Sequence, residues 1–352
     1  MRHRVMPGDP NLDQLNTRVS RATSYDVARL AGVSQSAVSR CFSQGASISD
    51  ETREKVQAAA RTLGYSPNAL ARSLITRRSG LVGLIVTDTT LRHSPQIVHD
   101  LGDALKQAQL MPLLSALRAE SDVENALPAI LDYQPEAIIS LVTISQVLIK
   151  DARALGVPVV LINRKAAHGV ATSICCDQAL GVKQLVAGLI ADGHRRLAFI
   201  AGPKGAPVSE ERLKGFQTAM SSAALKPAAV AYSDYTYEGG HAAALSVWKS
   251  QKRVDALVCA NDAMALGALD ACVADLGLGV PGDVSVTGFD DIAEGGRPMR
   301  GLTTVRQPTQ QMAALAVAET LRLCRSAGEQ RGAQHMIAGT LMLRRSSTIE
   351  RG

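Results

Sequence analysis

Apolar residues recur every three to four positions between residues 23 and 63, which is the spacing of helices with one buried face. The stretch TSYDVARLAGVSQSAVSRCFS predicts two short helices joined at Gly32, where the turn favours a positive φ. Thr23 and Ser34 stand where these helices begin, and Asp26 follows Thr23 at the capping-box distance. We expect the buried faces to contain Val27, Ala28, Leu30, Ala31, Val38 and Phe42.

A third and a fourth helix follow in the segment ISDETREKVQAAARTLGYSPN and beyond it. Ser49 caps the third helix, whose apolar stripe is Val56, Ala59, Ala60 and Leu63, and Gly64 ends it. Pro67 stands at the first position of a short fourth helix over about residues 68–74. The pattern divides this part into a flexible basic arm at 1–22, a helical domain at 23–67, and a hinge helix with its linker at 68–80.

From Leu81 onward, short apolar runs alternate with amphipathic helical stretches. The strand candidates are LVGLIVTD, MPLLSAL, AIISLV, VPVVLINR, RLAFIAGP, ALVCAND and VSVTGFDD. Such alternation predicts parallel sheets covered on both faces, and about 270 residues of it suit two doubly wound subdomains better than one sheet. Within 81–350 we expect an N-subdomain at about 81–175 and 308–330, and a C-subdomain at about 176–307 and 331–350.

Composition places the 352-residue chain among cytoplasmic proteins. No apolar run is long enough to cross a bilayer, and no apolar stretch follows Arg2 and Arg4 as in a secretory signal. The six cysteines lack metal-binding spacings and are expected to be reduced thiols. We therefore expect neither a metal nor a cofactor, and no membrane partner.

The positive charge is concentrated at the N-terminal end. Residues 1–80 contain 12 lysines and arginines against 6 aspartates and glutamates, whereas residues 81–352 contain 26 of each. A basic segment on a neutral body indicates contact with phosphates. For the stretch from Arg2 to Arg21, a solvated basic tail is the alternative interpretation.

The two opening helices have the layout of a helix-turn-helix, whose second helix enters the major groove. Gln35 can pair bidentately with adenine, and Arg40, one helical turn further, can bind guanine or a phosphate. Ser36 faces the same side, whereas Ser34 and Ser39 suit contacts to the DNA backbone, which position the protein but do not read the sequence.

Eight motifs occur in a specific order: YDVARLAGVSQSAVSR, ISDETREKV, LGYSPNALARSL, GHRRLAFIAGP, SEERLKGF, ANDAMALGAL, PGDVSVTGFDD and LTTVRQP. Over about residues 23–349 the chain resembles the lactose-repressor (LacI/GalR) family of transcription regulators. The resemblance implies an all-α helix-turn-helix headpiece and an α/β sensor similar to periplasmic sugar-binding proteins. It also implies a homodimer or tetramer, a near-palindromic operator of double-stranded DNA, and a small-molecule effector.

The resemblance gives the segment SPNALARSL a role in the minor groove. Leu74 would wedge into a central base step and kink the duplex, an unstacking cost recovered through added contacts. Ala71 would permit close helix approach in the dimer, while Asn68 and Arg72 would hold phosphates or groove edges. An ordinary core residue is the alternative for Leu74. The full set predicted to contact DNA is Tyr25, Ser34, Gln35, Ser36, Ser39, Arg40, Asn68, Ala71, Arg72 and Leu74.

The effector site is expected where predicted strands end, because open α/β sheets bind ligands there. The resemblance matches Arg212 to an arginine that holds ligand oxygens, and Tyr235 to an aromatic that stacks on the ligand. A surface ion pair is the alternative for Arg212, and helix capping is the preferred interpretation of Asp262. The predicted set is His93, Ser94, Gln96, Asn163, Arg164, Arg212, Tyr235, Asn261, Asp290 and Gln307.

One departure from the family pattern bears on the ligand. Family members often carry aspartate where this chain has Asn163, so a repulsive carboxylate is missing beside Arg164 and near Arg212. We therefore expect an oxygen-rich, anionic effector such as a sugar acid in preference to a neutral disaccharide.

Two other classes of protein compete with a regulator. Residues 81–350 alone would suit a sugar-binding protein, which the helical headpiece argues against. The chain has no GxSxG, P-loop, HExxH or GxGxxG motif after its first strand, and His194 is expected to be structural, so we do not expect an enzyme.

Overall fold

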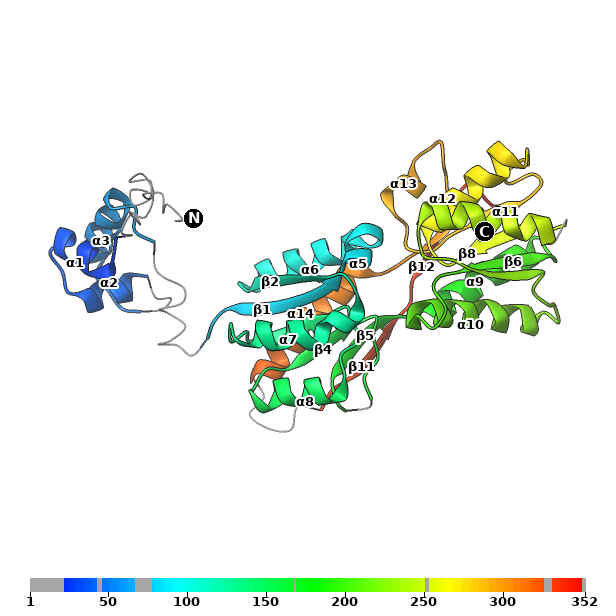
Figure 1. Ribbon diagram of the computed structural model, residues 1–352. Helices are drawn as coiled ribbons and strands as arrows, with labels where there is room; N and C mark the ends of the chain where they lie inside the picture. The colour runs from blue at the N-terminus through cyan, green and yellow to red at the C-terminus, as the bar shows by residue number, and fades with distance from the viewer. Residues whose placement is uncertain are drawn as a thin grey trace, which may run out of the picture. The chain divides into compact units, whose positions relative to one another are not determined.

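The computed structural model describes residues 22–42, 46–66, 78–167, 169–250, 253–325 and 331–349, with only the backbone of His93. The chain divides into two compact units at Ser79–Gly80 (Figure 1). Residues 1–21 of the predicted arm and the predicted fourth helix lie outside the described residues. The predicted DNA contacts at Asn68, Ala71, Arg72 and Leu74 lie outside them as well.

The first unit contains the predicted helices α1 (Ser24–Ala31), α2 (Gln35–Cys41) and α3 (Asp50–Thr62). The capping box at the start of α1 is present, because the Asp26 amide donates to the Thr23 hydroxyl and the Thr23 amide donates to the Asp26 carboxylate. At the starts of α2 and α3 the Ser34 and Ser49 hydroxyls accept from the Ala37 and Thr52 amides, and Gly32 has the expected left-handed conformation with φ of 65°. The local prediction of these helix starts is confirmed.

Val27, Val38 and Val56 form the centre of the headpiece core, one from each helix, and all three are fully buried. Leu30 was predicted to share this core, but 54% of its surface is exposed. With about 100° of rotation per residue, Leu30 lies well to one side of the face formed by Val27 and Ala31. The prediction for Leu63 is also wrong, because it follows the last turn of α3 and is 36% exposed.

A six-stranded parallel sheet, in the order β11-β5-β4-β3-β1-β2, forms the N-subdomain of the second unit. Its strands are β1 (Leu81–Thr87), β2 (Met111–Leu117), β3 (Ala137–Ser140), β4 (Val159–Ile162), β5 (Thr172–Cys176) and β11 (Gln334–Ile337). Its helices are α5 (Asp88–His93), α6 (Pro95–Gln107), α7 (Val123–Leu131), α8 (Gln146–Ala154) and α14 (Thr309–Arg325), with a 3₁₀ turn at Glu120–Asp122.

The C-subdomain has a four-stranded parallel sheet in the order β7-β6-β8-β9. Its strands are β6 (Leu197–Ala201), β7 (Ala229–Tyr232), β8 (Ala256–Cys259) and β9 (Ser285–Thr287). Its helices are α9 (Gln178–Ala191), α10 (Pro207–Ser222), α11 (Tyr237–Ser250), α12 (Asp262–Asp270) and α13 (Ala293–Gly296), with a π-helical turn at Ala271–Asp275. An antiparallel pair, β10 (Thr304–Arg306) with β12 (Thr340–Met342), accompanies the crossovers between the subdomains.

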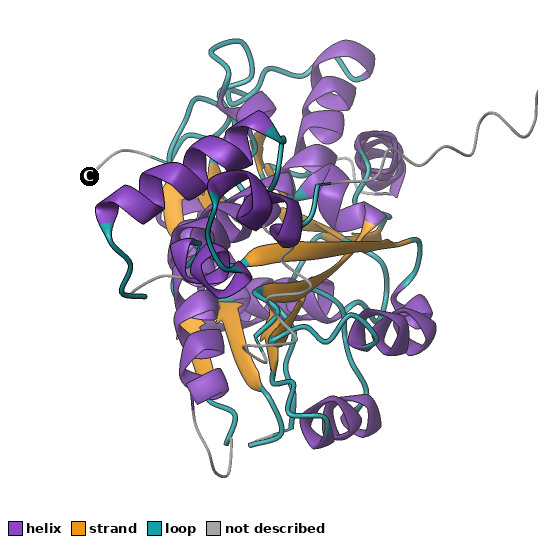
Figure 2. Cartoon of the chain, turned by 90° about the vertical axis from the view of Figure 1, so that its left-hand side faces the viewer, coloured by secondary structure: helices purple, strands orange, loops and turns teal. Residues whose placement is uncertain are grey.

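Helices cover the strands of both sheets, as Figure 2 shows, and this explains why most strands read as continuous apolar runs. Every residue of β1 except Leu81 and every residue of β6 and β8 is buried. The doubly wound architecture predicted from the alternation of strands and helices is confirmed.

The subdomain boundary drawn from sequence is wrong at one place. Residues 331–350 were assigned to the C-subdomain, but β11 pairs with β5 in the N-subdomain sheet, with Met336 opposite Cys175. Gly332 permits this return, because a Cβ there would lie 2.1 Å from the carbonyl carbon of Ala171. Strand β11 is short and only half-buried, so its sequence carries little signal for a buried strand.

Helices α9 and α10 approach closely at Gly215, where a Cβ would lie 2.5 Å from the carbonyl oxygen of Ala179. This contact brings Gln178, at the start of α9, beside Arg212 on α10. The helix packing therefore positions two polar side chains at the junction of the subdomains.

Candidate functional site

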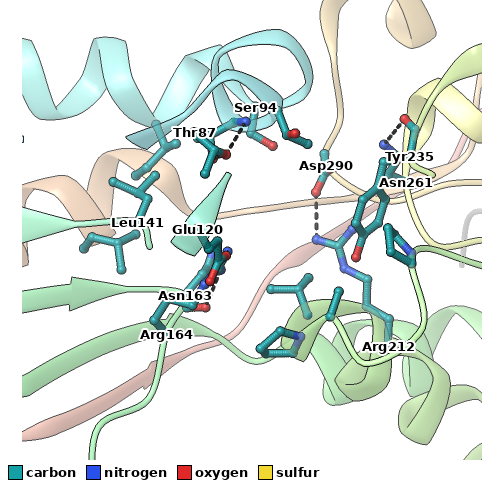
Figure 3. A pocket seen from close by; sticks show the side chains of 18 of the residues that line it. Thr87, Ser94, Glu120, Leu141, Asn163, Arg164, Arg212, Tyr235, Asn261 and Asp290 are labelled. Atoms are coloured by element: carbon teal, nitrogen blue, oxygen red, sulfur yellow. Dashed lines mark hydrogen bonds and ion pairs between the residues drawn. The ribbon is translucent and has the colours of Figure 1, made fainter. Parts of the chain in front are cut away.

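A cavity of about 560 Å³ lies between the two subdomains, within the range typical of small-molecule sites. The N-subdomain contributes residues at the ends of strands β1 to β4, and the C-subdomain contributes the start of α10 and the loops after β6 to β9. Side chains from the two subdomains face each other across this space (Figure 3).

Five polar side chains form a closed ring of hydrogen bonds at the base of the cavity. The Asn163 amide donates to Gln307 (2.9 Å), and the Gln307 amide donates to Oδ1 of Asp290 (2.7 Å). Arg212 donates to the same Asp290 oxygen (2.8 Å) and, through Nε, to Gln178 (2.8 Å). Gln178 then donates back to Oδ1 of Asn163 (3.4 Å), so the ring links residues of both subdomains.

Arg212 is buried, with only 2% of its surface exposed. Its guanidinium donates a further bond to the carbonyl of Ala260 and lies 3.8 Å from the centroid of the Phe289 ring, a cation–π distance. The alternative that Arg212 forms a surface ion pair is therefore wrong. The buried charge is matched by the carboxylate of Asp290.

A second ion pair lies on the N-subdomain wall, where Arg164 Nε donates to Oε1 of Glu120 (3.2 Å). Arg164 also donates to the carbonyl of Asn163 (2.9 Å), which fixes the direction of its side chain. Burial alone would raise the pKa of Glu120, but the charge and hydrogen bonds of Arg164, with bonds from Thr143, outweigh it and lower the pKa. Glu120 thus remains ionised and neutralises Arg164.

Asn261, and not Asp262, caps helix α12. Oδ1 of Asn261 accepts from the Met264 amide (3.0 Å), and its Nδ2 donates to the carbonyl of Tyr235 (3.0 Å). Asp262 is fully buried and accepts from the Ile292 amide (2.9 Å) and the Thr304 hydroxyl, so its predicted capping role is wrong. Burial, followed by the charge of Asp290, raises the pKa of Asp262 well above its usual range.

Tyr235 stands on the C-subdomain wall with a left-handed backbone, φ of 68°. Its ring packs against Gly202, where a Cβ would lie 2.2 Å from the ring carbon Cζ. The glycine therefore makes room for the ring beside Arg212 and Asn261 (Figure 3).

Eight predicted effector residues line the cavity: Ser94, Asn163, Arg164, Arg212, Tyr235, Asn261, Asp290 and Gln307. Gln96 does not, because it lies on α6 and its amide donates to Asp100 (2.8 Å), one turn further along the helix. The side chain of His93 is not described.

Sequence reasoning missed several residues of the site. Arg118 and Glu120 directly follow β2, and Lys204 follows β6, so the rule that ligands bind at strand ends could have identified them. Gln178 carried no such signal, because only its contact with Arg212 reveals its place in the ring.

The predicted base-reading residues of α2, namely Gln35, Ser36 and Arg40, are all exposed, whereas Val38 of the same helix is buried. The Gln35 amide reaches the Ser24 hydroxyl (3.4 Å), and the hydroxyls of Ser34 and Ser36 are 2.9 Å apart. Arg40 folds back toward the carbonyl of Ser36 (3.4 Å). Tyr25, on α1, is also exposed, at 69%. The headpiece thus presents a polar helix with long side chains available to a groove.

A helix-turn-helix unit joined to a two-subdomain α/β unit with a ligand-sized cavity defines the class of ligand-responsive DNA-binding regulators. Residues 23–68 match the family model of bacterial regulatory proteins, lacI family, and residues 186–347 match that of the periplasmic binding protein-like domain. The HTH-type transcriptional regulator AscG of Escherichia coli (strain K12) is 32% identical over 301 residues, 82% of this chain and 88% of that protein. The chain belongs to the lacI family and is a DNA-binding transcription regulator, not an enzyme.

Other relatives and solved structures agree with this assignment. The ribose operon repressor of Haemophilus influenzae is 30% identical and matches over 88% of this chain and 93% of its own length. The lac repressor dimer bound to operator and the anti-inducer ONPF superposes with a TM-score of 0.83 at 27% identity, over 93% of this chain and 99% of that one. The complex of the transcriptional regulator CelR with cellobiose gives a TM-score of 0.69 at 30% identity, over 93% and 100%. Within the described ranges, every helix is too short or too polar to span a bilayer.

Proposed function

We propose that this protein is a cytoplasmic homodimeric repressor of an operon for the catabolism of a sugar or sugar acid. It binds a near-palindromic operator, and an effector bound between the subdomains changes its affinity for that operator. The names of similar proteins support this, because they include a ribose operon repressor, a complex with cellobiose and an operator-bound repressor dimer. The six free cysteines suit a reducing compartment.

The ring of hydrogen bonds at the base of the cavity carries this proposal. Asn163 follows a strand of the N-subdomain, whereas Arg212 and Asp290 belong to the C-subdomain, and Gln307 lies on a crossover between them. A ligand that bonds to this ring must favour one relative arrangement of the subdomains. It can shift the equilibrium only by its differential affinity for the two arrangements, and coupling of this kind is typically about 1–3 kcal/mol.

On the DNA side, we propose that Gln35, Ser36 and Arg40 read base edges in the major groove, while Ser34 and Ser39 contact the backbone. The exposure of these side chains on α2 supports this assignment. We propose, on the basis of the family resemblance, that Leu74 is the minor-groove wedge.

Selection of duplexes from a random pool by the full-length protein tests the function. The expected result is a symmetric consensus site, bound by two copies of the chain, whose affinity changes several-fold when an effector is added. Fluorescence anisotropy of the selected duplex, with sugars and sugar acids titrated in turn, measures that change. A protein that binds a sugar but selects no sequence would instead be a plain sugar-binding protein.

Leu74→Ala tests the wedge separately from base reading. Energy transfer between dyes at the two ends of the selected duplex should report a straighter DNA in the variant complex, with the sequence preference retained. A variant that bends and binds the duplex as the parent does would remove the wedge from the proposal.

A further inference from the structure

We infer that the effector carries an anionic group, a carboxylate or a phosphate, which binds between Arg118 of the N-subdomain and Lys204 of the C-subdomain. The inference rests on the proposed function, because it concerns the chemistry of the ligand that the same cavity binds. It follows from the charges on the cavity wall, from the helices that begin there and from the scarcity of aromatic surface.

Most charges on the wall are already paired within the protein. The charged residues that line the cavity are Arg118, Glu120, Arg164, Lys204, Arg212, Asp234 and Asp290. Glu120 neutralises Arg164, and Asp290 neutralises the buried Arg212. These two pairs leave two cations and one carboxylate to face a ligand.

The remaining carboxylate, Asp234, is held by local hydrogen bonds. It accepts from the Thr236 hydroxyl (2.6 Å), the Thr236 amide (3.0 Å) and the Ser233 hydroxyl (3.3 Å). Hydrogen bonding from Thr236 lowers the pKa of Asp234, so the group is an anion. All three bonds go to Oδ1, which fixes the direction of the carboxylate. Two cations against one carboxylate leave a net positive charge for a ligand.

Arg118 and Lys204, in contrast, are exposed and have no hydrogen-bond or ion-pair partner among the described residues. Arg118 follows β2 and Lys204 follows β6, so each subdomain contributes one of the two cations. Two like charges on facing walls repel each other when the cavity narrows, and an anion between them converts that repulsion into attraction. The charge of the ligand would thus act on the relative movement of the two subdomains, which the ring of hydrogen bonds also joins.

Two long helices also begin at the cavity without a side-chain cap. Helix α6 begins after Ser94 and helix α10 after Ala206; both residues line the cavity, and neither side chain makes a cap hydrogen bond. The neighbouring helices α5 and α9, by comparison, are capped by Thr87 and Asp177. The positive ends of α6 and α10 add to the attraction that the two cations exert on an anion.

The wall offers little surface on which a neutral sugar ring could stack. Among the described residues that line the cavity, Tyr235 is the only aromatic one. Its ring lies against Gly202, and the apolar wall opposite is aliphatic, with Ile97, Leu141 and Ile162. Hydrogen bonds and charge, rather than stacking, must therefore supply most of the specificity.

Calorimetry and thermal-shift measurements on the full-length protein test the inference with matched probes. The probes are glucose, gluconate, glucuronate and glucose 6-phosphate, the corresponding ribose set, and inorganic phosphate at constant ionic strength. We expect at least one anionic probe to bind more tightly than its neutral parent sugar, and its affinity to fall as NaCl is raised. Carboxylate and phosphate probes distinguish the two sources of negative charge.

Arg118→Gln and Lys204→Gln should each weaken binding of the anionic probe, inorganic phosphate included, by about tenfold, because each removes one charge-assisted bond. Lys183→Gln is the matched control, since Lys183 is exposed on α9, lies outside the cavity and gives the same change in charge. The control should bind as the parent does.

Three results would overturn the inference: a neutral sugar that binds while its acid and phosphate do not, Gln variants that bind the anion as tightly as the parent, or no binding of any anionic probe. The first of these would leave the proposed function intact if the neutral sugar also changed operator binding. Failure to select any operator would instead count against the proposed function alone.

Discussion

Arg212 and Asp290 form a buried ion pair, with Nη2 of the arginine 2.8 Å from Oδ1 of the aspartate and side chains that are 3% and 9% exposed. The two residues come from α10 and from the loop after β9, so the pair joins two layers of the C-subdomain at the base of the cavity. Gln178 and Gln307 complete the hydrogen bonds of the pair, which keeps both charges satisfied.

Arg212→Met should lower the free energy of unfolding by about 3–5 kcal/mol, because it leaves Asp290 buried without its cation. The double variant with Asp290→Leu should recover much of that loss, since both charges are then removed. Urea unfolding followed by the fluorescence of Trp248, the single tryptophan, measures both values. A double variant no more stable than Arg212→Met would show that the pair is not the cause. Both variants are expected to lose effector binding.

Gln35→Ala should weaken binding to the selected operator by about 1–3 kcal/mol and relax the preference at one base pair of each half-site. The fold of the headpiece should not change, because Gln35 is exposed and its contact to Ser24 is long, at 3.4 Å. Anisotropy on operators substituted one base pair at a time measures the effect, with circular dichroism as the control for folding. A uniform loss over all substituted operators would make Gln35 a backbone contact.

Asp262→Asn should change how stability depends on pH. Burial raises the pKa of Asp262 in the folded state, so the folded protein favours the protonated acid. The stability that Asp262 contributes is therefore fully present below its pKa in the unfolded chain, about 3.9. This contribution declines as the pH rises toward the pKa of Asp262 in the folded protein. The asparagine can accept from Ile292 and donate to Thr304 at every pH.

The free energy of unfolding of Asp262→Asn, relative to that of the parent, should thus increase as pH is raised from about 4 toward 8. Urea unfolding at several pH values measures this difference in the free energy of unfolding. A difference that stayed constant over that range would mean that the pKa of Asp262 is not raised.

Cys324 should be the only cysteine that reacts quickly with a thiol reagent in the folded protein. It is exposed, whereas the other five of the six cysteines are buried. Burial also raises the pKa of Cys175 to about 11, and those of Cys176 and Cys272 to about 12, so their thiolates are scarce at neutral pH. Titration with a chromogenic disulfide should release about one equivalent at once in the folded protein and six after denaturation. Cys324→Ser should abolish the fast phase.

Much of this protein could be read from the chain itself. The starts of α1, α2 and α3 follow from Thr23, Ser34 and Ser49, because a cap involves hydrogen bonds within three residues. The buried strands appear as apolar runs because helices cover both faces of each sheet. Asn163 and Asp290 could be placed at the cavity because they follow such strands.

The pairing of the site residues was decided only by the tertiary structure. Asn163 meets Gln307 across 144 positions of sequence, and Arg212 meets Asp290 across 78. Contacts of this kind also decide which charges are neutralised inside the protein. They therefore decide that Arg118 and Lys204 are left for a ligand. The return of β11 to β5 is of the same kind. A local pattern reports which face of an element is buried, whereas the partner across that face is set by how distant segments pack.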